Sequence, residues 1–574
     1  MAGRRRGLVW LVLALAAGIY AVQLARWRPL ALQGNAPADG FTRVVGAVHA
    51  HTTLSDGGGT PEEVIAAARA AGLGFLVLTD HNNLDAAPLQ GYHDGLLVIV
   101  GSELSTTAGH VLGLGIRDPI YRFSGDARDA LDDVRDLGGF AFAAHPTSNR
   151  EDFKWSGNDL PGPWGLELLS GDSEWRRANG FVLARTALGY GFNPGRALLG
   201  SLARPSETLA LWDRLLTQRD VVGIGGTDAH SRVQLGKRHS LRAPSYAALF
   251  SVVGNTVLLR APLSGDAVAD TAAVLEALRA GRSYVAVAGL APPHGFRFEA
   301  SDGTQRTAIG EHVVPSAGLR LLAGGATPAG TRLRLLRDGS PVAEAEAALD
   351  EPAATPGVYR VEAVVPGWDV PWVLSNPIYV FDSAAQAARS QRAAWPSEPE
   401  PPQPALLLDT FEGRSVFAPG HDQTSTLELP LLDPHGGLAG SGAARLAFHV
   451  GIPSATTPSP YCALVDTTPR DLRGRQGIVF SIRSDREYRV WFQVRDQNPA
   501  STDDDGQEYW FASVRTQPQW RRVAIPFARL RSINPRSDGR LDLDKVRGIV
   551  FVLDRGSVKP DTRGTLWLDD LGLY

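Results

Sequence analysis

The sequence of 574 residues contains a single cysteine, Cys462. One cysteine cannot close a disulfide within the chain, and it excludes a metal cluster held by several thiolates. The sequence also lacks an excess of charge: its formal net charge is −4, and it has neither an acidic tail nor the basic surface of a nucleic-acid-coating protein. Any bound metal ion would therefore depend on histidine, aspartate and glutamate side chains.

A chain of this length is expected to fold into roughly three or four domains. Its composition, 44% hydrophobic and 21% charged, is ordinary for folded protein. Shifts in texture along the chain predict a multidomain protein with an α/β barrel and two β-rich segments. We expect a cytoplasmic tip at 1–6, a transmembrane anchor at 7–27, a linker at 28–44, a barrel at 45–290, a β-sandwich at 291–383, a Pro-rich linker at 384–404 and a jelly-roll β-sandwich at 405–574.

The N-terminus combines Arg4, Arg5 and Arg6 with an apolar run from Leu8 to Val22. Such a run is barely long enough to cross a hydrocarbon core of about 30 Å as a helix. Preceding positive charge favours a cytoplasmic N-terminus. The sequence therefore predicts a membrane-anchored protein whose bulk is extracytoplasmic, in the periplasm or outside the cell. Secretion after cleavage of a signal peptide is the alternative.

Between residues 45 and 290, apolar strands alternate with helical segments. Thr60, Pro61 and Glu63 mark a helix start, with Thr60 as N-cap and Glu63 in the capping-box position. Fully apolar strands between helices imply a parallel sheet covered on both faces, in a barrel or in an open α/β sheet. The strands that the sequence predicts with most support are Phe75–Leu78, Leu96–Val100, residues 140–144 and residues 221–225.

Metal-ligating residue types follow these strands directly. His49 and His51 share a face if they continue a strand, because side chains alternate with period two. His110 follows Glu103 by seven residues and could fold back beside it. In a parallel barrel the carboxyl ends of the strands meet at one rim. The resulting metal-ligand candidates are His49, His51, Asp56, His81, Glu103, His110, His145, Asp228 and His230.

This candidate set is too large for one metal ion, which takes about three to six protein ligands. Two or three divalent ions are therefore expected, with carboxylates such as Glu103 able to bridge them. A site of this kind suits hydrolysis: one ion lowers the pKa of bound water toward about 7, and the others polarise the substrate. We expect His230 or a metal-bound water to protonate the leaving group. Asp80 is a second catalytic candidate, and could instead orient an imidazole.

The strand-end motifs resemble those of the PHP (polymerase and histidinol phosphatase) family of metal-dependent phosphoesterases. The resemblance covers about residues 45–290 and implies a distorted (β/α)7 barrel, a dinuclear or trinuclear site at the nine positions, and Mn, Zn or Fe as the metal. Asp56 stands where some members carry histidine. The matching motifs are His49-Ala50-His51, Ser55-Asp56-Gly57, Thr79-Asp80-His81-Asn82, Gly101-Ser102-Glu103, Gly109-His110, Ala144-His145-Pro146 and Thr227-Asp228-Ala229-His230.

Two further segments, Leu278 to Val285 and Trp372 to Tyr379, resemble the CehA/McbA group within that family. The name of that group derives from carbamate or amide ester hydrolysis, so the resemblance does not fix phosphorus as the centre attacked. We expect a metal-dependent phosphoesterase acting on a small-molecule phosphoester. A hydrolase of carboxylic, carbamate or amide esters is the alternative, and a non-catalytic glycan-binding surface protein is the second alternative.

Other polar residues near the motifs have weaker assignments. Arg117 and Arg150 could clamp an anionic substrate, or they are solvated loop arginines. Glu167 could support the rim as a carboxylate that is not itself a ligand.

The C-terminal segment alternates in the manner of β-strands and resembles the jelly roll of carbohydrate-binding modules. Trp491 or Trp510 could stack on a sugar ring, or they belong to the core. Four carboxylates could hold a structural calcium ion through oxygen ligands: Asp409, Glu412, Asp569 and Asp570.

Overall fold

The computed structural model describes residues 11, 15, 18–235, 239–397, 399–500, 506–532, 534 and 536–574. Within these residues no helix has both the length and the apolar character needed to cross a bilayer. The predicted cytoplasmic tip, and residues 7–10, 12–14, 16 and 17 of the predicted anchor, lie outside the described residues. The anchor and the extracytoplasmic location stay predictions.

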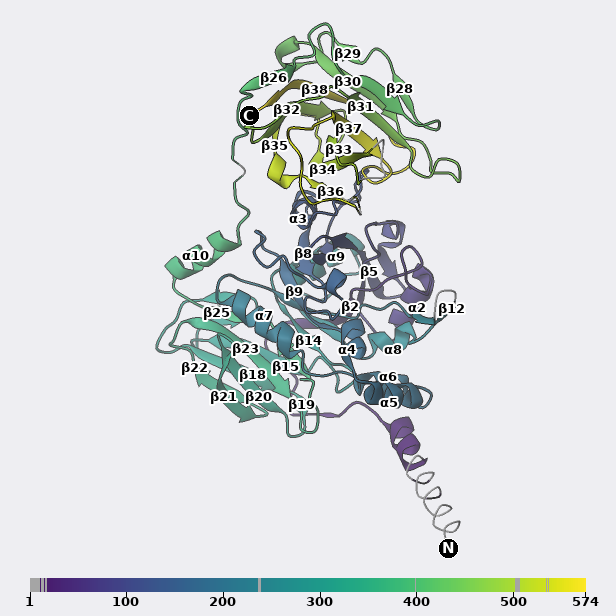
Figure 1. The fold of residues 1–574 in the computed structure, drawn as a ribbon. Helices are drawn as coiled ribbons and strands as arrows, with labels where there is room; N and C mark the ends of the chain where they lie inside the picture. The colour runs from purple at the N-terminus through teal and green to yellow at the C-terminus, as the bar shows by residue number, and fades with distance from the viewer. Residues whose placement is uncertain are drawn as a thin grey trace. The chain divides into compact units, whose positions relative to one another are not determined.

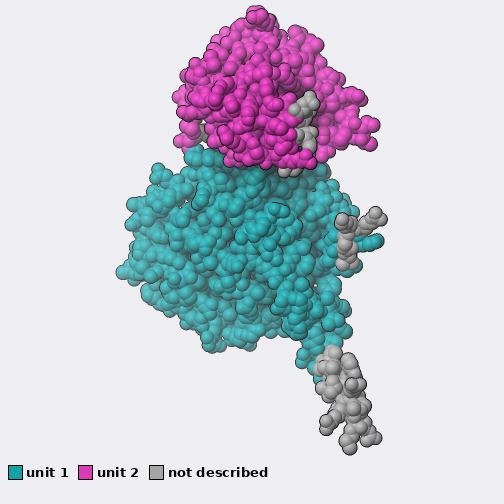
Figure 2. All heavy atoms as spheres, in the orientation of Figure 1, with its two compact units in different colours: residues 1–117, 125–396 teal, residues 118–124, 397–574 magenta. Residues whose placement is uncertain are grey.

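The chain divides into two compact units (Figure 2). Unit 1 comprises residues 1–117 and 125–396, and unit 2 comprises residues 118–124 and 397–574. The short segment 118–124 therefore belongs to unit 2, although its neighbours on both sides belong to unit 1. The main division at residue 396 lies within the predicted Pro-rich linker.

Unit 1 is built on a ring of strands interleaved with helices (Figure 1). Parallel pairing joins β2 to β3 and β3 to β5, and also β8 to β9 and β9 to β10. Bridges from Ala50 to Ala229 and from His81 to Glu103 connect these groups and close the ring. Its strands are β2 (Thr42–Val48), β3 (Phe75–Leu78), β5 (Leu96–Val100), β6 (Ser102–Thr106), β7 (Gly109–Leu114), β8 (Phe140–Ala143), β9 (Gly165–Ser170) and β10 (Gly223–Gly226).

Helices pack on this ring, and their starts follow from local sequence. Thr60 caps α2 by accepting from the backbone N–H of Glu63, whose carboxylate returns the bond to the Thr60 N–H, so the predicted capping box is present. One apolar cluster joins side chains of β2, β3, β5, β7, β8, β10 and α9. The helices against the strands are α2 (Pro61–Ala70), α3 (Ala127–Asp136), α7 (Ser206–Leu216) and α9 (Ala267–Arg279).

The ring is mixed, which corrects the expectation of a parallel sheet. β7 pairs antiparallel with both β6 and β8. Only Thr107 and Ala108 separate β6 from β7, and so short a connection permits a hairpin but no parallel crossover. The hairpin places His110 opposite Ser105, and so brings His110 back toward Glu103.

The predicted β-sandwich at 291–383 shares a sheet with the ring. β13 (Gly254–Leu259) pairs with β2, and the same 12-stranded sheet continues through β14 (Ser283–Ala286), β24 (Val373–Ser375), β23 (Gly357–Val364) and β25 (Ile378–Val380). A second, four-stranded sheet contains β15 (Phe296–Ser301) and β18 (Arg320–Gly325). The segment is β-rich, as expected, and it is continuous with the barrel.

The predicted Pro-rich linker at 384–404 begins as helix α10 (Ser383–Ala393), which corrects its N-terminal boundary. Its alanines favour helix, and Asp382 caps it by accepting from the Ala385 N–H. Arg389 anchors the helix: it is 3% exposed, donates from Nε to Asp220 Oδ1 at 2.8 Å, and donates from Nη2 to the Leu216 carbonyl at 2.8 Å.

Unit 2 is a sandwich of two antiparallel sheets, as the jelly-roll prediction requires. Side chains alternate between a large apolar core and the outer faces. The β-strands expected from the alternation in this segment are present. One sheet contains β30 (Ala443–His449), β32 (Gly477–Ser484), β35 (Arg521–Pro526) and β38 (Arg563–Leu573), and the other contains β31 (Tyr461–Asp466), β33 (Arg489–Gln497), β34 (Gln507–Arg515) and β37 (Gly548–Asp554).

The Arg389→Ala substitution tests the role of α10. It removes two charge-assisted hydrogen bonds and leaves Asp220 paired only with His312. We expect the free energy of unfolding of unit 1 to fall by about 1–3 kcal/mol, measured from its urea transition. Arg392 is exposed on the same helix, and Arg392→Ala should cost much less. Equal effects of the two substitutions would contradict an anchoring role for Arg389.

Candidate metal centre

The structure brings all nine predicted ligands together at one end of the ring. His49 and His51 follow β2, His81 follows β3, Glu103 lies in β6 and His110 in β7. His145, Asp228 and His230 follow β8 and β10. Convergence of strand ends therefore assembles side chains that are up to 181 positions apart in sequence, counting from 49 to 230.

The backbone is unusual where these side chains leave the strands. His49, His145 and Asp228 have positive φ angles of 72°, 29° and 46°. Non-glycine residues rarely adopt this region, and they tend to do so where surrounding structure holds a functional side chain. His49 thus reaches the site from a left-handed turn just beyond β2. The expectation that His49 continues a regular strand is therefore wrong.

Glu103 lies at the centre of the cluster. Its Oε1 is 2.8 Å from His110 Nδ1 and 3.0 Å from His145 Nε2. Its Oε2 is 3.1 Å from His49 Nε2 and 3.0 Å from His51 Nε2. The carboxylate is 1% exposed, and each of its oxygens faces at least two imidazoles.

A second carboxylate, Asp228, lies against the same imidazoles. Its Oδ1 is 3.4 Å from His49 Nε2, 3.5 Å from His51 Nε2 and 3.3 Å from His230 Nδ1. Its side chain is 7% exposed. Two buried carboxylates and the imidazoles between them form a compact set of nitrogen and oxygen donors.

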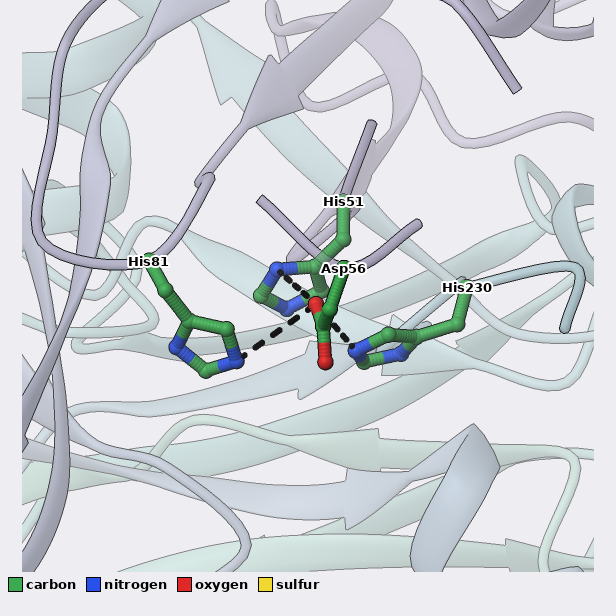
Figure 3. Close-up of side chains that lie close together, drawn as sticks. All are labelled: His51, Asp56, His81 and His230. Atoms are coloured by element: carbon green, nitrogen blue, oxygen red, sulfur yellow. Dashed lines mark ion pairs between the residues drawn. The ribbon is translucent and has the colours of Figure 1, made fainter. Parts of the chain in front are cut away.

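Asp56 lies between His51, His81 and His230 (Figure 3). Its Oδ1 lies 3.1 Å from His230 Nε2, 3.7 Å from His81 Nε2 and 3.8 Å from His51 Nδ1. The Asp56 side chain is 53% exposed. This corner therefore opens to solvent, whereas the corner at Glu103 does not.

The charges of the cluster depend on one another. Burial alone would raise the pKa values of Glu103 and Asp228, but the surrounding imidazoles hold both well below the ordinary range. Burial alone would lower the pKa values of His145 and His230, but the carboxylates raise both to about 9. Protons here occupy positions that a divalent cation would take, so metal binding would release protons.

The donor set fits divalent metal ions. Within the described residues, several buried ring nitrogens form no hydrogen bond, although a carboxylate oxygen lies 3.0–3.8 Å from each: His49 Nε2, both ring nitrogens of His51 and His81 Nδ1. Such groups are costly to bury unpaired. Imidazole and carboxylate together suit Zn, Mn or Fe. Three groups of closely spaced ligand atoms can be drawn, namely His51–Asp56–His81–His230, His49–His51–Glu103–Asp228 and His81–Glu103–His110.

His145 is in none of these three groups, but it contacts Glu103 directly. The groups share His51, His81 and Glu103, so ions held at neighbouring groups would share ligands. This sharing supports a site for more than one ion. The number and identity of the ions stay predictions.

Asp80 has a different position from the ligands. Its Oδ1 accepts from the Thr52 N–H at 2.7 Å and from the Ser55 hydroxyl at 2.6 Å, and its Oδ2 accepts from the Thr52 hydroxyl at 2.8 Å. The carboxylate therefore holds the loop that carries Asp56. These contacts give Asp80 a part in positioning that loop, and its catalytic role stays a prediction.

Glu167 is a buried carboxylate that we expected to support the rim without binding metal. Its Oε1 accepts from His49 Nδ1 at 2.8 Å, and its Oε2 accepts from the His145 backbone N–H at 2.5 Å. The first bond directs His49 Nε2 toward Glu103. Gly226 makes room for it, because a Cβ at that position would lie 1.3 Å from Glu167 Oε1. The apolar strand Leu166–Leu169 with one glutamate was the sequence signal.

A cavity of about 450 Å³ opens over the cluster. Among the sequence-predicted arginines, Arg150 lines it and Arg117 does not. Arg176 and Arg232, which sequence reasoning missed, line it as well. The wall also contains Phe153 and Trp175 together with Ser148, Ser173, Asp172, Val233 and Gln234.

The arginines of the cavity are tied to its wall. The Arg150 guanidinium lies 3.4 Å from the centre of the Phe153 ring, and that of Arg176 lies 4.5 Å from the Trp175 ring. Arg232 donates to the Asp56 carbonyl. The guanidiniums are thus held at the cavity, where they can meet a negatively charged group.

The predicted calcium ligands of unit 2 bond to their own chain. Asp409 accepts from the Phe411 and Val416 N–H groups and the Ser415 hydroxyl. Glu412 accepts from the Gly442 N–H, and Asp569 from the Leu438 N–H. Within the described residues, these carboxylates are in no group of ligand atoms close enough for an ion. Their contacts do not support calcium.

The two tryptophans proposed for sugar stacking differ in position. Trp510 is 6% exposed and belongs to the core of unit 2, so its core interpretation is correct. Trp491 is half-buried on the other face of β33. Its indole N–H donates to Asp554 at 3.0 Å.

Comparisons with known proteins give similarities at modest levels. No family model matches the chain. An uncharacterized protein of Methanocaldococcus jannaschii is 28% identical over 92 residues, which are 15% of this chain and 53% of that protein. The chain thus spans about half the length of the curated relative it matches.

Solved structures show similarity to two kinds of domain. A two-domain protein from Bacteroides vulgatus, containing a predicted PHP-like metal-dependent phosphoesterase, is 16% identical, with 61% of this chain and 99% of that chain covered at a TM-score of 0.31. A family 11 carbohydrate-binding module from Clostridium thermocellum is 22% identical, with 29% and 94% covered at a TM-score of 0.24. The sequence predicted a resemblance to these two kinds of protein, and the comparisons confirm that resemblance.

Removing the hydrogen bond that orients His49 should weaken metal binding, although all the metal ligands would remain. We expect Glu167→Ala to lower the affinity for Zn or Mn by about 10–100-fold, measured by competition with a chelator. Glu167→Gln keeps an acceptor for His49 Nδ1 and should lose less. Unchanged affinity in a folded Glu167→Ala protein would show that His49 needs no support from Glu167.

Proposed function

We propose that unit 1 is a metal-dependent hydrolase that acts on phosphoesters. The observation that carries the proposal is the convergence of the nine predicted ligands around two central carboxylates, Glu103 and Asp228, with all of them except His49 and His51 lining one cavity. A buried set of this size has no purely structural use, because its unpaired nitrogens cost stability. Guanidiniums on the cavity wall favour an anionic substrate.

Some residues of the site would hold the metal ions, and one would transfer a proton. His49, His51, His81, His110, Glu103 and Asp228 would hold divalent ions, with Asp56, His145 and His230 completing the set. Bound ions would supply Lewis acidity and an activated water molecule at neutral pH. His230 donates from Nδ1 to the Asp228 carbonyl at 3.0 Å, which leaves Nε2 beside Asp56 at the open corner. This Nε2 would either complete the ligand set or, when protonated, deliver a proton to the leaving group.

Hydrolysis of carboxylic, carbamate or amide esters on the same site is the alternative. The donor set alone does not distinguish the two reactions, since polarisation by metal ions serves both. Arg150 and Arg232 favour the phosphoester because a neutral ester offers no charge for them to pair with. Arg176 is already paired with Asp172 in the same wall.

A panel of phosphomonoesters, phosphodiesters, carboxylic esters and carbamates, assayed on metal-loaded full-length protein, tests the proposal. We expect phosphoester hydrolysis that falls at least about 1000-fold in Glu103→Ala, because the central carboxylate is lost. Asp270→Asn, which alters a buried carboxylate on α9 away from the site, should retain activity. Faster turnover of carbamates or carboxylic esters would transfer the assignment to the alternative.

The arginines of the cavity predict a charge-specific effect. Arg150→Ala should raise KM for an anionic phosphoester by roughly tenfold and leave KM for a neutral ester unchanged. Arg117→Ala is the matched control, because Arg117 does not line the cavity. Steady-state kinetics on both substrates provides the measurement. Equal effects on the two substrates would exclude a role for Arg150 in charge recognition.

Glycan binding by unit 2 is a second candidate function. Trp491, Phe511 and Tyr509 follow one another on the same face of neighbouring strands, with ring centres 6.3 and 6.5 Å apart. Arg495 lies over the Tyr509 ring. Aromatic side chains beside polar ones can stack on sugar rings and bond their hydroxyls. This function is compatible with catalysis by unit 1.

A further inference from the structure

Helix α5 (Gly180–Tyr190) presents an apolar face outward. Phe181 is 77% exposed and Leu188 is 75% exposed, and Phe192 just beyond the helix is 55% exposed. Phe181, Ala184 and Leu188 have helical spacing, so they share one side of the helix. A surface helix ordinarily turns such residues inward. Clustered exposed apolar side chains mark a surface that meets a partner or a membrane.

The N-terminal helix adjoins this face. Leu24 is buried, and the added Cβ of an alanine at Gly189 in α5 would lie 3.0 Å from its Cδ1. Asn193 donates from Nδ2 to the Leu24 carbonyl at 3.1 Å. Ile19 and Val22 are each 52% exposed. Helix α5 thus lies beside residues 18–26 of the N-terminal helix (Figure 1), which also expose apolar side chains.

The positive charge of this region comes from arginines. Residues 1–38 and 178–203 contain arginines and no aspartate or glutamate, although the whole chain has a net charge of −4. The flanking Arg176, Arg177 and Arg204 form ion pairs with Asp172, Glu207 and Glu362. Trp27 and Trp368 lie with ring centres 5.5 Å apart, and the Arg196 guanidinium is 5.0 and 4.7 Å from them. Tryptophan with arginine is the combination found where protein meets the headgroup layer of a bilayer.

We propose that α5 and Phe192 lie in the surface of a bilayer that contains anionic lipid, beside the N-terminal helix. Apolar side chains would enter the boundary of the acyl chains, and the arginines would meet the headgroups. A second copy of the chain is the less suitable occupant, because Arg185 and Arg196 on two such faces would repel each other.

A single reporter group tests this contact. Cys462 is fully buried, so a new surface thiol can be labelled selectively with a nitrobenzoxadiazole fluorophore. Full-length Leu188→Cys is compared with Val268→Cys, since Val268 is 81% exposed on α9. Each protein is mixed with vesicles of phosphatidylcholine, with or without phosphatidylglycerol, and its emission is recorded. Circular dichroism and gel filtration report folding and self-association.

Vesicles with phosphatidylglycerol should raise the emission of the label at position 188 roughly threefold and shift it to shorter wavelength. The label at position 268 should stay unchanged, and vesicles without anionic lipid should have a weaker effect on position 188. An unchanged signal at position 188 while the protein floats with the vesicles would overturn the proposal. A signal change without vesicles, together with self-association, would overturn it in favour of a dimer.

Discussion

The site depends on a buried carboxylate surrounded by imidazoles. Glu103 contacts His49, His51, His81, His110 and His145. An unpaired carboxylate at this depth would cost several kcal/mol, and so would the unpaired imidazole nitrogens beside it. Each is tolerable only in the presence of the other or of a metal ion. The contacts between Glu103 and the imidazoles hold the strand ends in position. The same nitrogen and oxygen atoms are suited to bind cations.

The ring places these groups at the cost of local strain. His49, His145 and Asp228 occupy a region of φ that non-glycine residues rarely adopt. Surrounding contacts hold them there: Glu167 bonds both the His49 ring and the His145 backbone, and Gly226 leaves space for that carboxylate. Asp80 likewise holds the loop that carries Asp56, by accepting hydrogen bonds from Thr52 and Ser55. Residues beyond the ligands thus fix the geometry of the ligands.

Much of the site could be predicted from sequence because its signals are local. Each ligand follows an apolar strand within a few residues, and a ring of strands gathers their ends. The capping box of Thr60 and Glu63 is equally local. The roles of Glu167 and Asp80 depend on side chains more than twenty positions away, so no short pattern shows them. The antiparallel β7 follows from a turn of Thr107 and Ala108 that contains no obvious hairpin signal.

The expectations for the remaining chain differ in the same way. Alternating strands of unit 2 were predictable because each strand has its own two-residue period. The continuity of the sheet between the barrel and residues 291–383 was not, because strand pairing joins segments distant in sequence. The arrangement of the arginines around the cavity likewise depends on the fold. The sequence does not show which arginines will line it.

Metal content is the most direct test of the central claim that Glu103 organises a hydrolytic centre of several ions. Elemental analysis of purified full-length protein, expressed with Mn, Zn and Fe available, gives the number of ions per chain. The account predicts roughly two or three, with a marked loss in Glu103→Ala. A folded protein that contains no metal would contradict it.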